Sequence, residues 1–377
     1  FTGVLIGVGS GVNVITAQYV GAKSRRDVEE TVHTAALICL IVGLVILAFG
    51  AIFTRVLLEL LNTKDELIDG AALYLRIYFL GMPALAIYNF GNGVLSAVGD
   101  TKKPLYFLAL AGVINVLLNL FFVIVCKLDV AGVAIASIVS QYISAALIII
   151  SLMRSGEMHA LRVRLLRITA SKAKRLLQLG IPAGLQNAIF QIANLFIQTG
   201  VNSFDAVVVE GNSAAANADA LVYDVMNAIY VACSSFMGQN YGAHKRDRVM
   251  KSYFISLAYS FGAGAILGLS LVFFGRSFLA IFTTEPEVIE AGMSRLTIMG
   301  LSYAISAFMD CSIAASRGLG RSLVPTIIVI LGSCVFRVIW FYTVFAYFGT
   351  ITSLYLLYAF SWSITAAAEI AYFARCC

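Results

Sequence analysis

The sequence predicts an all-α integral membrane protein built from two similar, parallel lobes, and two observations support this fold class. First, 60% of the 377 residues are hydrophobic and only 12% are charged, whereas globular proteins average roughly 25% charged residues. Second, the stretch from Gln239 to Val249 repeats the stretch from Gln18 to Val28, with Gln, Gly, Ala, Arg and Val in the same order. The two stretches are 221 residues apart, and the same offset pairs Gly99 with Gly320. We therefore expect two copies of one helical unit.

Apolar runs recur along the whole chain, and each is near or above the roughly 20 residues that a helix needs to cross a bilayer. They are residues 2–20, 32–53, 67–98, 105–126, 130–153, 176–203, 213–240, 252–274, 288–316, 325–347 and 352–374. Phe1 already lies inside the first run, and its repeat partner Val222 lies in the middle of a helix. We therefore expect eleven helices in this sequence, with the first helix and part of the second missing upstream, in a protein of two six-helix lobes.

A basic segment, residues 154–175, separates an N-terminal lobe, residues 1–153, from a C-terminal lobe, residues 176–377. Its charges are Arg154, Arg162, Arg164, Arg167, Lys172, Lys174 and Arg175. Such a pattern is typical of an amphipathic helix that lies on the inner leaflet of a membrane. Its charged face is either simply solvated or docks a specific lipid or protein, and we favour the solvated face.

Basic loops set the orientation, because the cytoplasmic loops of membrane proteins carry an excess of Lys and Arg. Alternate loops hold most of these residues, and both copies of the repeated stretch fall in this basic set. We therefore expect the basic loops and the linker on the cytoplasmic side of the plasma membrane. The two lobes then share one orientation and are related by a pseudo-two-fold axis along the membrane normal, as in transporters with parallel repeats. Anionic lipid accounts for the net charge of +6, so no nucleic-acid partner is expected.

The helix after the linker carries a polar stripe. Its five amides recur at steps of 4, 3, 4 and 4 residues and are Asn187, Gln191, Asn194, Gln198 and Asn202. They share an arc of about 80° and span about 22 Å along the axis. Polar groups inside a spanning helix are costly and point to function. The stripe either lines a substrate cavity or forms interhelical hydrogen bonds of about 0.6 kcal/mol each, and we favour the cavity because packing needs fewer amides.

A carboxylate in the next apolar run is one candidate for binding a coupling ion. Asp224 shares a helix face with Asn217, seven residues earlier. It would lie about 16 Å into the membrane if its helix begins near residue 213. Asp219, in the same run, is expected near the outer surface, where water would solvate it.

Asp310 is the second candidate. It shares a helix face with Tyr303, and its repeat partner is Asn89. It would lie about 10 Å from the cytoplasmic end of its helix. There it could bind and release a proton, or exchange that proton for Na⁺. The alternative is a structural ion pair with Arg317 or Arg337.

Other charges within apolar runs include Arg76, Arg295, Arg337 and Glu369. Arg337 lies deep enough that we expect it to need an acidic partner, whereas Arg295 can snorkel toward the outer surface. Glu369 is near the inner end of the last run. We expect it to be a snorkelled or paired charge.

The sequence offers no sign of an enzyme. It lacks a GxxxxGK[ST] phosphate loop, and His33, His159 and His244 do not have the spacing of metal ligands. No Ser/His/Asp set is apparent either. We therefore expect no cofactor beyond the coupling ion, and an ion gradient as the source of energy.

Several loop motifs resemble those of the multidrug and toxic compound extrusion (MATE) family. They are Gly238-Gln239-Asn240-Tyr241-Gly242-Ala243 followed by Asp247-Arg248, the paired Gln18/Gly21-Ala22 loop, Gly99-Asp100-Thr101-Lys102-Lys103-Pro104, Gly180-Ile181-Pro182 and Arg317-Gly318-Leu319-Gly320. The resemblance covers the whole chain. It implies twelve helices in two six-helix lobes, and export of organic, often cationic, compounds in exchange for H⁺ or Na⁺.

The sequence departs from the family pattern at two places. Prokaryotic members often use an Asp of the first helix for coupling, and that helix is absent here. Many members of one branch carry an acid in the helix after the linker, where this chain has Asn187 and Gln191. Asp310 resembles the acidic position of the tenth helix only loosely.

These features lead us to expect an exporter of organic, cationic compounds that works by antiport with H⁺ or Na⁺. The expected partners are small-molecule substrates and membrane lipid, and the expected state is a monomer. The alternatives are a lipid-linked oligosaccharide or lipid flippase of the same superfamily, and a membrane scaffold or receptor that transports nothing.

Overall fold

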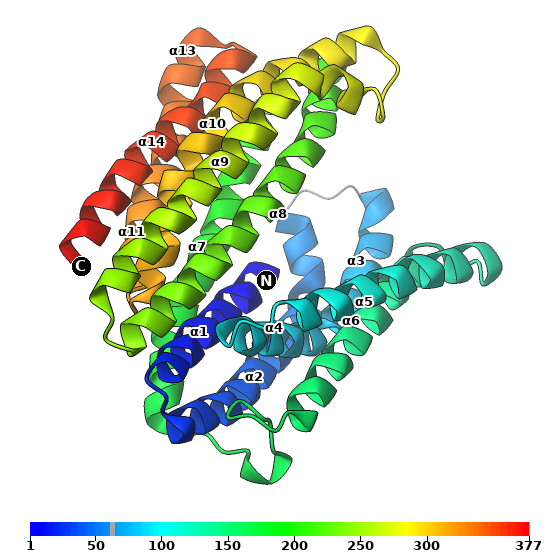
Figure 1. Cartoon of the computed structure of the whole chain (residues 1–377). Coiled ribbons are helices and arrows are strands. Elements are labelled where there is room, and N and C mark those ends of the chain that lie inside the picture. The colour runs from blue at the N-terminus through cyan, green and yellow to red at the C-terminus, as the bar shows by residue number, and fades with distance from the viewer. Residues whose placement is uncertain (61–64, 377) are drawn as a thin grey trace. The chain divides into compact units, whose positions relative to one another are not determined.

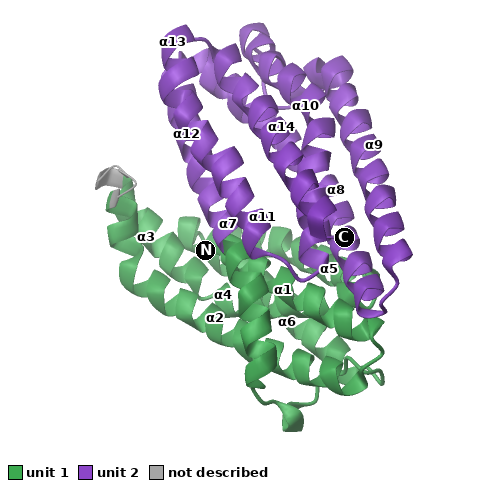
Figure 2. Ribbon diagram, turned by 90° about the vertical axis from the view of Figure 1, so that its left-hand side faces the viewer, with its two compact units in different colours: residues 1–184 green, residues 185–377 purple. Residues whose placement is uncertain are grey.

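The computed structural model describes residues 1–60 and 65–376, and it contains helices but no strand in these ranges (Figure 1). The chain forms two compact units, Phe1–Gly184 and Leu185–Cys377, which Figure 2 colours separately. The division falls inside α7 (Ala170–Val201), so the basic segment and the first turns of α7 belong to unit 1. The helical fold class predicted from the sequence is confirmed.

Unit 1 is organised around a buried central helix, α4. In order, its helices are α1 (Thr2–Gly21), α2 (Arg25–Leu60), α3 (Asp65–Phe79), α4 (Met82–Ala97), α5 (Lys102–Leu120) and α6 (Asp129–Arg154). A π-helical turn, Phe121–Val125, follows α5. α4 packs against α1, α2 and α6. Its side chains Phe90 and Leu95 are buried in the core of the unit.

Glycines bring α7 close to α1. Gly7 and Gly11 are four residues apart in α1, as Gly180 and Gly184 are in α7. A Cβ at Gly7 would overlap the backbone of Gly184, and one at Gly11 would lie 3.0 Å from the nitrogen of Gly180. Paired small residues of this kind let membrane helices meet at backbone contact. The start of α7 is therefore held tightly to unit 1.

Unit 2 is organised around α10. Its elements are the end of α7, α8 (Ala206–Gly242), α9 (Arg246–Leu279), α10 (Pro286–Gly318), α11 (Leu323–Val329), α12 (Phe336–Trp340), α13 (Ala346–Phe348) and α14 (Ile351–Cys376). Two π-helical turns, Ile330–Val335 and Phe341–Phe345, join α11, α12 and α13 into one continuous run. α10 packs against α8, α9 and α14. At the offset of 221 residues, α10 corresponds to α3 and α4 together.

Ten of the eleven predicted runs meet the criteria for a membrane span within the described residues. Nine are long, apolar helices, and the tenth is the pair Leu67–Phe79 and Met82–Ala97, which bends by 44°. The break falls at Leu80 and Gly81, just before Pro83, a residue that lacks a backbone donor. α7 is the run that does not qualify. Its amide stripe lowers its hydropathy, although it is helical throughout the predicted range up to Val201.

The internal repeat is visible in the backbone. α2 and α9 begin at Arg25 and Arg246, and α5 and α11 begin at Lys102 and Leu323. Both pairs of positions are 221 residues apart. The offset found in the sequence is therefore also the offset between equivalent helix starts, and the predicted duplication is confirmed.

The repeated stretch itself is a left-handed turn that ends a helix. The φ angles of Lys23 and His244 are 55° and 56°. In the first copy the amide of Ser24 donates to the carbonyl of Tyr19, at 3.1 Å. The amide of Lys245 repeats this bond in the second copy, at 2.9 Å. This is the Schellman arrangement, which satisfies the last carbonyls of a helix.

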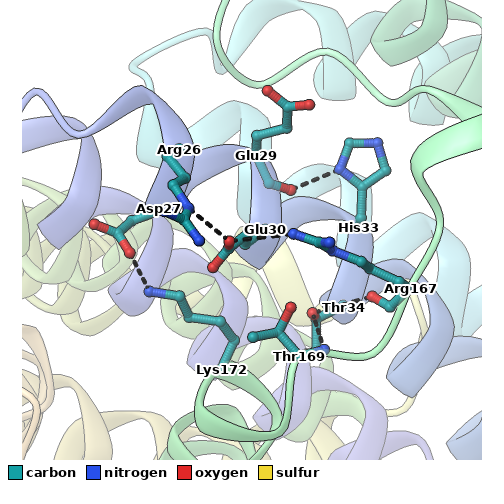
Figure 3. A network of polar contacts seen from close by, with 9 residues as sticks. All are labelled: Arg26, Asp27, Glu29, Glu30, His33, Thr34, Arg167, Thr169 and Lys172. Atoms are coloured by element: carbon teal, nitrogen blue, oxygen red, sulfur yellow. Dashed lines mark hydrogen bonds and ion pairs between the residues drawn. The ribbon is translucent and has the colours of Figure 1, made fainter.

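The linker does not form the predicted amphipathic helix. Between α6 and α7 only Val163–Leu165 makes a short 3₁₀ turn. Side chains of α2 hold this segment through its backbone. The His33 ring accepts the amide of Arg162 at 3.0 Å. The Thr34 hydroxyl donates to the carbonyl of Arg167 at 3.3 Å and accepts the amide of Thr169 at 3.0 Å (Figure 3). These bonds replace the ones that a helix would have supplied.

Ion pairs also hold the linker against α2. Arg167 lies 3.3 Å from the carboxylate of Glu30, and Lys172 pairs with Asp27 (Figure 3). Arg167 is largely exposed, but Lys172 is buried and its ammonium also lies 3.9 Å from the ring centre of Tyr19. The basic residues of the linker therefore bind α2 and α1 in addition to any contact with lipid.

Candidate functional site

The amide stripe of α7 is partly exposed and partly bonded. Asn187, Gln191, Asn194 and Gln198 lie in the helix, and Asn202 follows its last residue. Gln191 and Asn202 are exposed, whereas the other three are half-buried. The amide of Gln198 donates to Asn202 at 2.9 Å, and Asn194 accepts a hydrogen bond from another helix. The stripe thus combines packing contacts with amides that remain accessible to a ligand.

Arg337 of α12 makes that second contact. Its guanidinium donates to Asn194 at 3.0 Å and to the hydroxyl of Ser361 at 3.4 Å. It also lies 4.5 Å and 4.7 Å from the ring centres of Phe190 and Tyr358. Arg337 is 1% exposed, and no described carboxylate lies within ion-pair distance of it. The predicted acidic partner was wrong, because an amide, a hydroxyl and two aromatic faces surround the cation instead.

Arg295 and Asp219 form the buried ion pair of unit 2. The guanidinium of Arg295 donates to Asp219 through Nε at 2.9 Å and to Asn212 through Nη1 at 2.6 Å. Tyr303 donates to the second oxygen of Asp219, and Tyr355 donates to Asn212 at 3.1 Å. Side-chain exposure is only 10% for Arg295 and 16% for Asp219. Arg295 therefore does not snorkel and Asp219 is not solvated, contrary to both expectations.

Asp310 lies on α10, seven residues after Tyr303 and on the same side of the helix. Its Oδ2 atom is buried and has no hydrogen-bond partner. Neither Arg317 nor Arg337 comes within the 4.0 Å of an ion pair, although both act on it electrostatically. Asp310 is thus a half-buried acid with one buried, unpartnered oxygen, and the alternative of a structural ion pair is not seen.

Arg317 directs its hydrogen bond elsewhere. Its Nη2 donates at 2.8 Å to the side-chain oxygen of Gln186 on α7, which also accepts from the hydroxyl of Thr326 at 3.4 Å. The Nε of Arg317 is buried and has no partner. Arg317 therefore connects α10, which carries Asp310, to the beginning of the amide stripe on α7.

The remaining predicted residues are Asn217, Asp224 and Asn89. Asn217 and Asp224 are exposed on α8, and the amide of Asn217 donates to the carbonyl of Ser213 in its own helix at 3.1 Å. Asn89 lies in unit 1, where it is half-buried and donates to the carbonyl of Leu85 at 2.9 Å.

Glu369 of α14 was not predicted as a site residue. Its side chain is fully buried, and both of its carboxylate oxygens lack a hydrogen-bond partner. It neither snorkels nor pairs, so the expectation for it was wrong. A signal was available in the sequence, because Ser361, Thr365 and Glu369 recur every four residues on one face of the last helix. In the structure that face points into the unit, where the Thr365 and Ser333 hydroxyls lie 2.9 Å apart.

The described part of the chain contains no cluster of His, Cys, Asp and Glu that could hold a metal ion. What unit 2 does contain is a polar interior within a membrane-sized helix bundle. Its buried acids and guanidinium groups have unfilled hydrogen-bonding capacity. Such an interior can take up and release protons or small cations.

Known proteins similar to this chain are transporters. The MatE family model matches residues 1–121 and 182–343. The probable multidrug resistance protein YoeA of Bacillus subtilis is 27% identical over 332 residues, which are 86% of this chain and 71% of the relative. The FAD transporter of Shewanella oneidensis is 27% identical over 294 residues, which are 76% of this chain and 64% of the relative.

Solved structures have the same fold. An outward-facing multidrug resistance MATE family transporter superposes with a TM-score of 0.91 at 19% identity, covering all of this chain and 85% of that chain. A MOP superfamily transporter from Pyrococcus furiosus gives a TM-score of 0.92 at 19% identity, covering 99% and 84%. The family model spans most of the sequence and these structures share its two-lobe helical fold, so the chain belongs to the MatE family of multi-pass membrane transporters.

Proposed function

We propose that this protein exports organic cations across the plasma membrane by antiport with H⁺ or Na⁺, as a monomer and without a further cofactor. The observation that carries the proposal is the free, buried oxygen of Asp310 in the polar interior of unit 2. An ionised carboxylate costs several kcal/mol to bury when it lacks a full set of partners. Binding of H⁺ or Na⁺ removes that cost. Asp310 therefore suits a group that alternates between an ion-loaded and an ion-free state.

The substrate path is proposed to run along α7. Gln191 and Asn202 offer exposed amides, and Asn187, Asn194 and Gln198 extend the same stripe. Amides donate and accept hydrogen bonds without a fixed charge, so they tolerate varied organic compounds. Asn217, Tyr303 and Asn89 are proposed to add polar contacts. Asp224, exposed on α8, is proposed as a second acid that attracts cations.

The names of the relatives support export of drugs but differ in substrate. YoeA is described as a probable multidrug resistance protein and the Shewanella relative as an FAD transporter. The chain spans 71% and 64% of their lengths, respectively. We propose cytoplasmic placement for the basic loops and the linker, because they carry the Lys and Arg excess.

A flippase for a lipid-linked oligosaccharide is the second candidate. Arg337 favours it, because this buried guanidinium has no acidic partner among the described residues and could meet a phosphate. The acids Asp310 and Glu369 argue against it, since their carboxylates would repel a pyrophosphate. An organic cation therefore fits the interior better than an anion.

Dye efflux tests the proposal. Liposomes containing the protein should export a cationic dye when an inward H⁺ or Na⁺ gradient is imposed, and a protonophore or removal of Na⁺ should identify the ion. Asp310→Asn should reduce gradient-driven efflux by about 100-fold, on the scale of losing an essential proton carrier. Asp247→Asn, an exposed acid at the start of α9, is the control and should retain efflux. Full efflux by Asp310→Asn would remove this residue from the coupling mechanism.

A further inference from the structure

Glu369 is a fully buried acid, and the proposed antiport does not use it. It is 0% exposed on α14, and neither carboxylate oxygen has a hydrogen-bond partner. The charged groups that face it are Arg317 and Asp310 of α10, and Arg337 of α12 acts on Asp310. None of these comes within ion-pair distance of Glu369. An unpaired carboxylate in such a place is stable only when it carries a proton.

The internal repeat shows that the fold does not require this acid. Ser361 and Thr365 of α14 correspond to Ser140 and Ser144 of α6 at the offset of 221, and all four are buried. At the same offset Glu369 corresponds to Ile148, which is also 0% exposed. Unit 1 therefore builds the same face with an apolar side chain. The carboxyl group of Glu369 is an addition that a role in packing does not explain.

Arg317 is placed to respond to Glu369. Its guanidinium acts electrostatically on Glu369, but its hydrogen bond goes to Gln186, at 2.8 Å. Its Nε is buried and unpartnered. If Glu369 loses its proton, an ionised carboxylate will compete with a neutral amide for this guanidinium. The bond to Gln186 has one charged partner, whereas a bond to the carboxylate has two opposite charges that also attract each other, so the carboxylate is the preferred partner.

Gln186 transmits this competition to the substrate stripe. It immediately precedes Asn187 on α7, and it is 8% exposed. Its side-chain oxygen is bonded to both α10 and α11 through Arg317 and Thr326. Loss of the Arg317 bond would leave a single long bond of 3.4 Å to Thr326. The attachment of this part of α7 to unit 2 would weaken.

We propose that Glu369, Arg317 and Gln186 form a proton-operated switch. When Glu369 is protonated, Arg317 binds Gln186 and holds the start of the amide stripe. When the proton leaves to solvent, Arg317 pairs with the Glu369 carboxylate and releases Gln186. The switch rests on the proposed antiport, for which it would link proton release to the substrate-binding helix.

Amide hydrogen exchange in lipid nanodiscs tests the switch without requiring transport. The protection factors of residues 183–191, corrected for the intrinsic effect of pH, should fall about 10-fold between about pH 5 and about pH 8 in the native protein. Glu369→Gln cannot lose a proton and should keep high protection at both values. Glu290→Gln removes an exposed acid of α10 and should behave as the native protein does.

A pH response that persists in Glu369→Gln, or that is absent from the native protein, would overturn the proposal. Gln186→Leu provides a second test if Glu369→Gln does not fold. It should show low protection at both pH values, and native-like protection would again overturn the switch. Gradient-driven dye efflux measured on the same samples tests the antiport separately. Absent efflux with an intact exchange response would reject the transport proposal and leave the switch standing.

Discussion

The ion pair between Arg295 and Asp219 predicts that breaking a buried ion pair costs much more unfolding free energy than breaking an exposed one. Its Nη2–Oδ2 distance is 2.5 Å, and exposure of the two side chains is 10% and 16%. A second pair of unit 2, Arg276 and Glu290, also has a distance of 2.5 Å, but its side chains are 70% and 58% exposed. The two pairs differ mainly in burial. They therefore form a matched experiment within one unit.

Breaking the buried pair should be costly. Asp219→Asn removes the charge that balances Arg295 and weakens two hydrogen bonds from its guanidinium. Removal of one partner from a buried ion pair costs about 3–5 kcal/mol. Glu290→Gln at the exposed pair should cost about 0–1 kcal/mol. Arg295→Met combined with Asp219→Asn should recover part of the loss, because no uncompensated charge then remains.

Reversible unfolding in mixed detergent–SDS micelles measures these free energies. A double-mutant cycle over Arg295 and Asp219 should give a coupling energy of about 3 kcal/mol, at the upper end of values for residues in contact. Equal destabilisation by Asp219→Asn and Glu290→Gln would refute the reasoning. So would a double variant that is as unstable as the sum of the two single variants.

Three further outcomes are expected. Gly7→Ala should destabilise the protein by about 1–3 kcal/mol or more, because the added methyl group would overlap the backbone of Gly184. Gly112→Ala is the control and should be neutral, because nothing lies within 4 Å of the added methyl group. Equal unfolding free energies for the two variants would contradict the close contact of α1 and α7. Burial lowers the pKa of His159, so the folded loop favours the neutral imidazole ring. The stability of the loop should therefore be full above the unfolded pKa of about 6.5 and fall as the pH drops through the lower folded pKa. Equal protection of residues 155–162 from hydrogen exchange at acid and neutral pH would count against this. Glu369→Ile should raise the unfolding free energy by about 1–4 kcal/mol, because isoleucine is the residue at the equivalent position of unit 1. A clear loss of stability would show that the carboxyl group supports the fold.

Local chemistry made much of the fold predictable. The repeat offset depends on residues such as Gly99 and Gly320, whose φ angles of 89° and 83° favour glycine. Apolar runs became helices because a bilayer leaves backbone groups no other partners. The same logic failed at the linker. Its basic pattern suggested a helix, but Thr34 and His33, more than a hundred residues earlier, bind backbone groups of this segment, which forms only a short 3₁₀ turn.

Partners of the intramembrane charges were harder to predict. Helical periodicity gives the face and depth of Arg337, but it does not say which helix lies opposite. In the structure α7 lies there, and its Asn194 accepts a hydrogen bond from Arg337. It likewise could not show that Asp219 would meet Arg295, 76 residues away. These contacts are set by tertiary packing. A pattern within one helix contains no information about them.

The two copies of the repeat separate the needs of the fold from those of transport. Four charged positions of unit 2 have neutral counterparts in unit 1 at the offset of 221: Asp310 with Asn89, Arg317 with Ser96, Arg337 with Val116 and Glu369 with Ile148. The helix starts at Arg25 and Arg246 and at Lys102 and Leu323 nevertheless keep this offset, as do the left-handed turns at Lys23 and His244 and at Gly99 and Gly320. The charges are therefore not needed to specify this backbone. Because charged groups with unfilled hydrogen-bonding capacity inside a protein reduce stability, these four positions support the proposal that unit 2 exchanges ions.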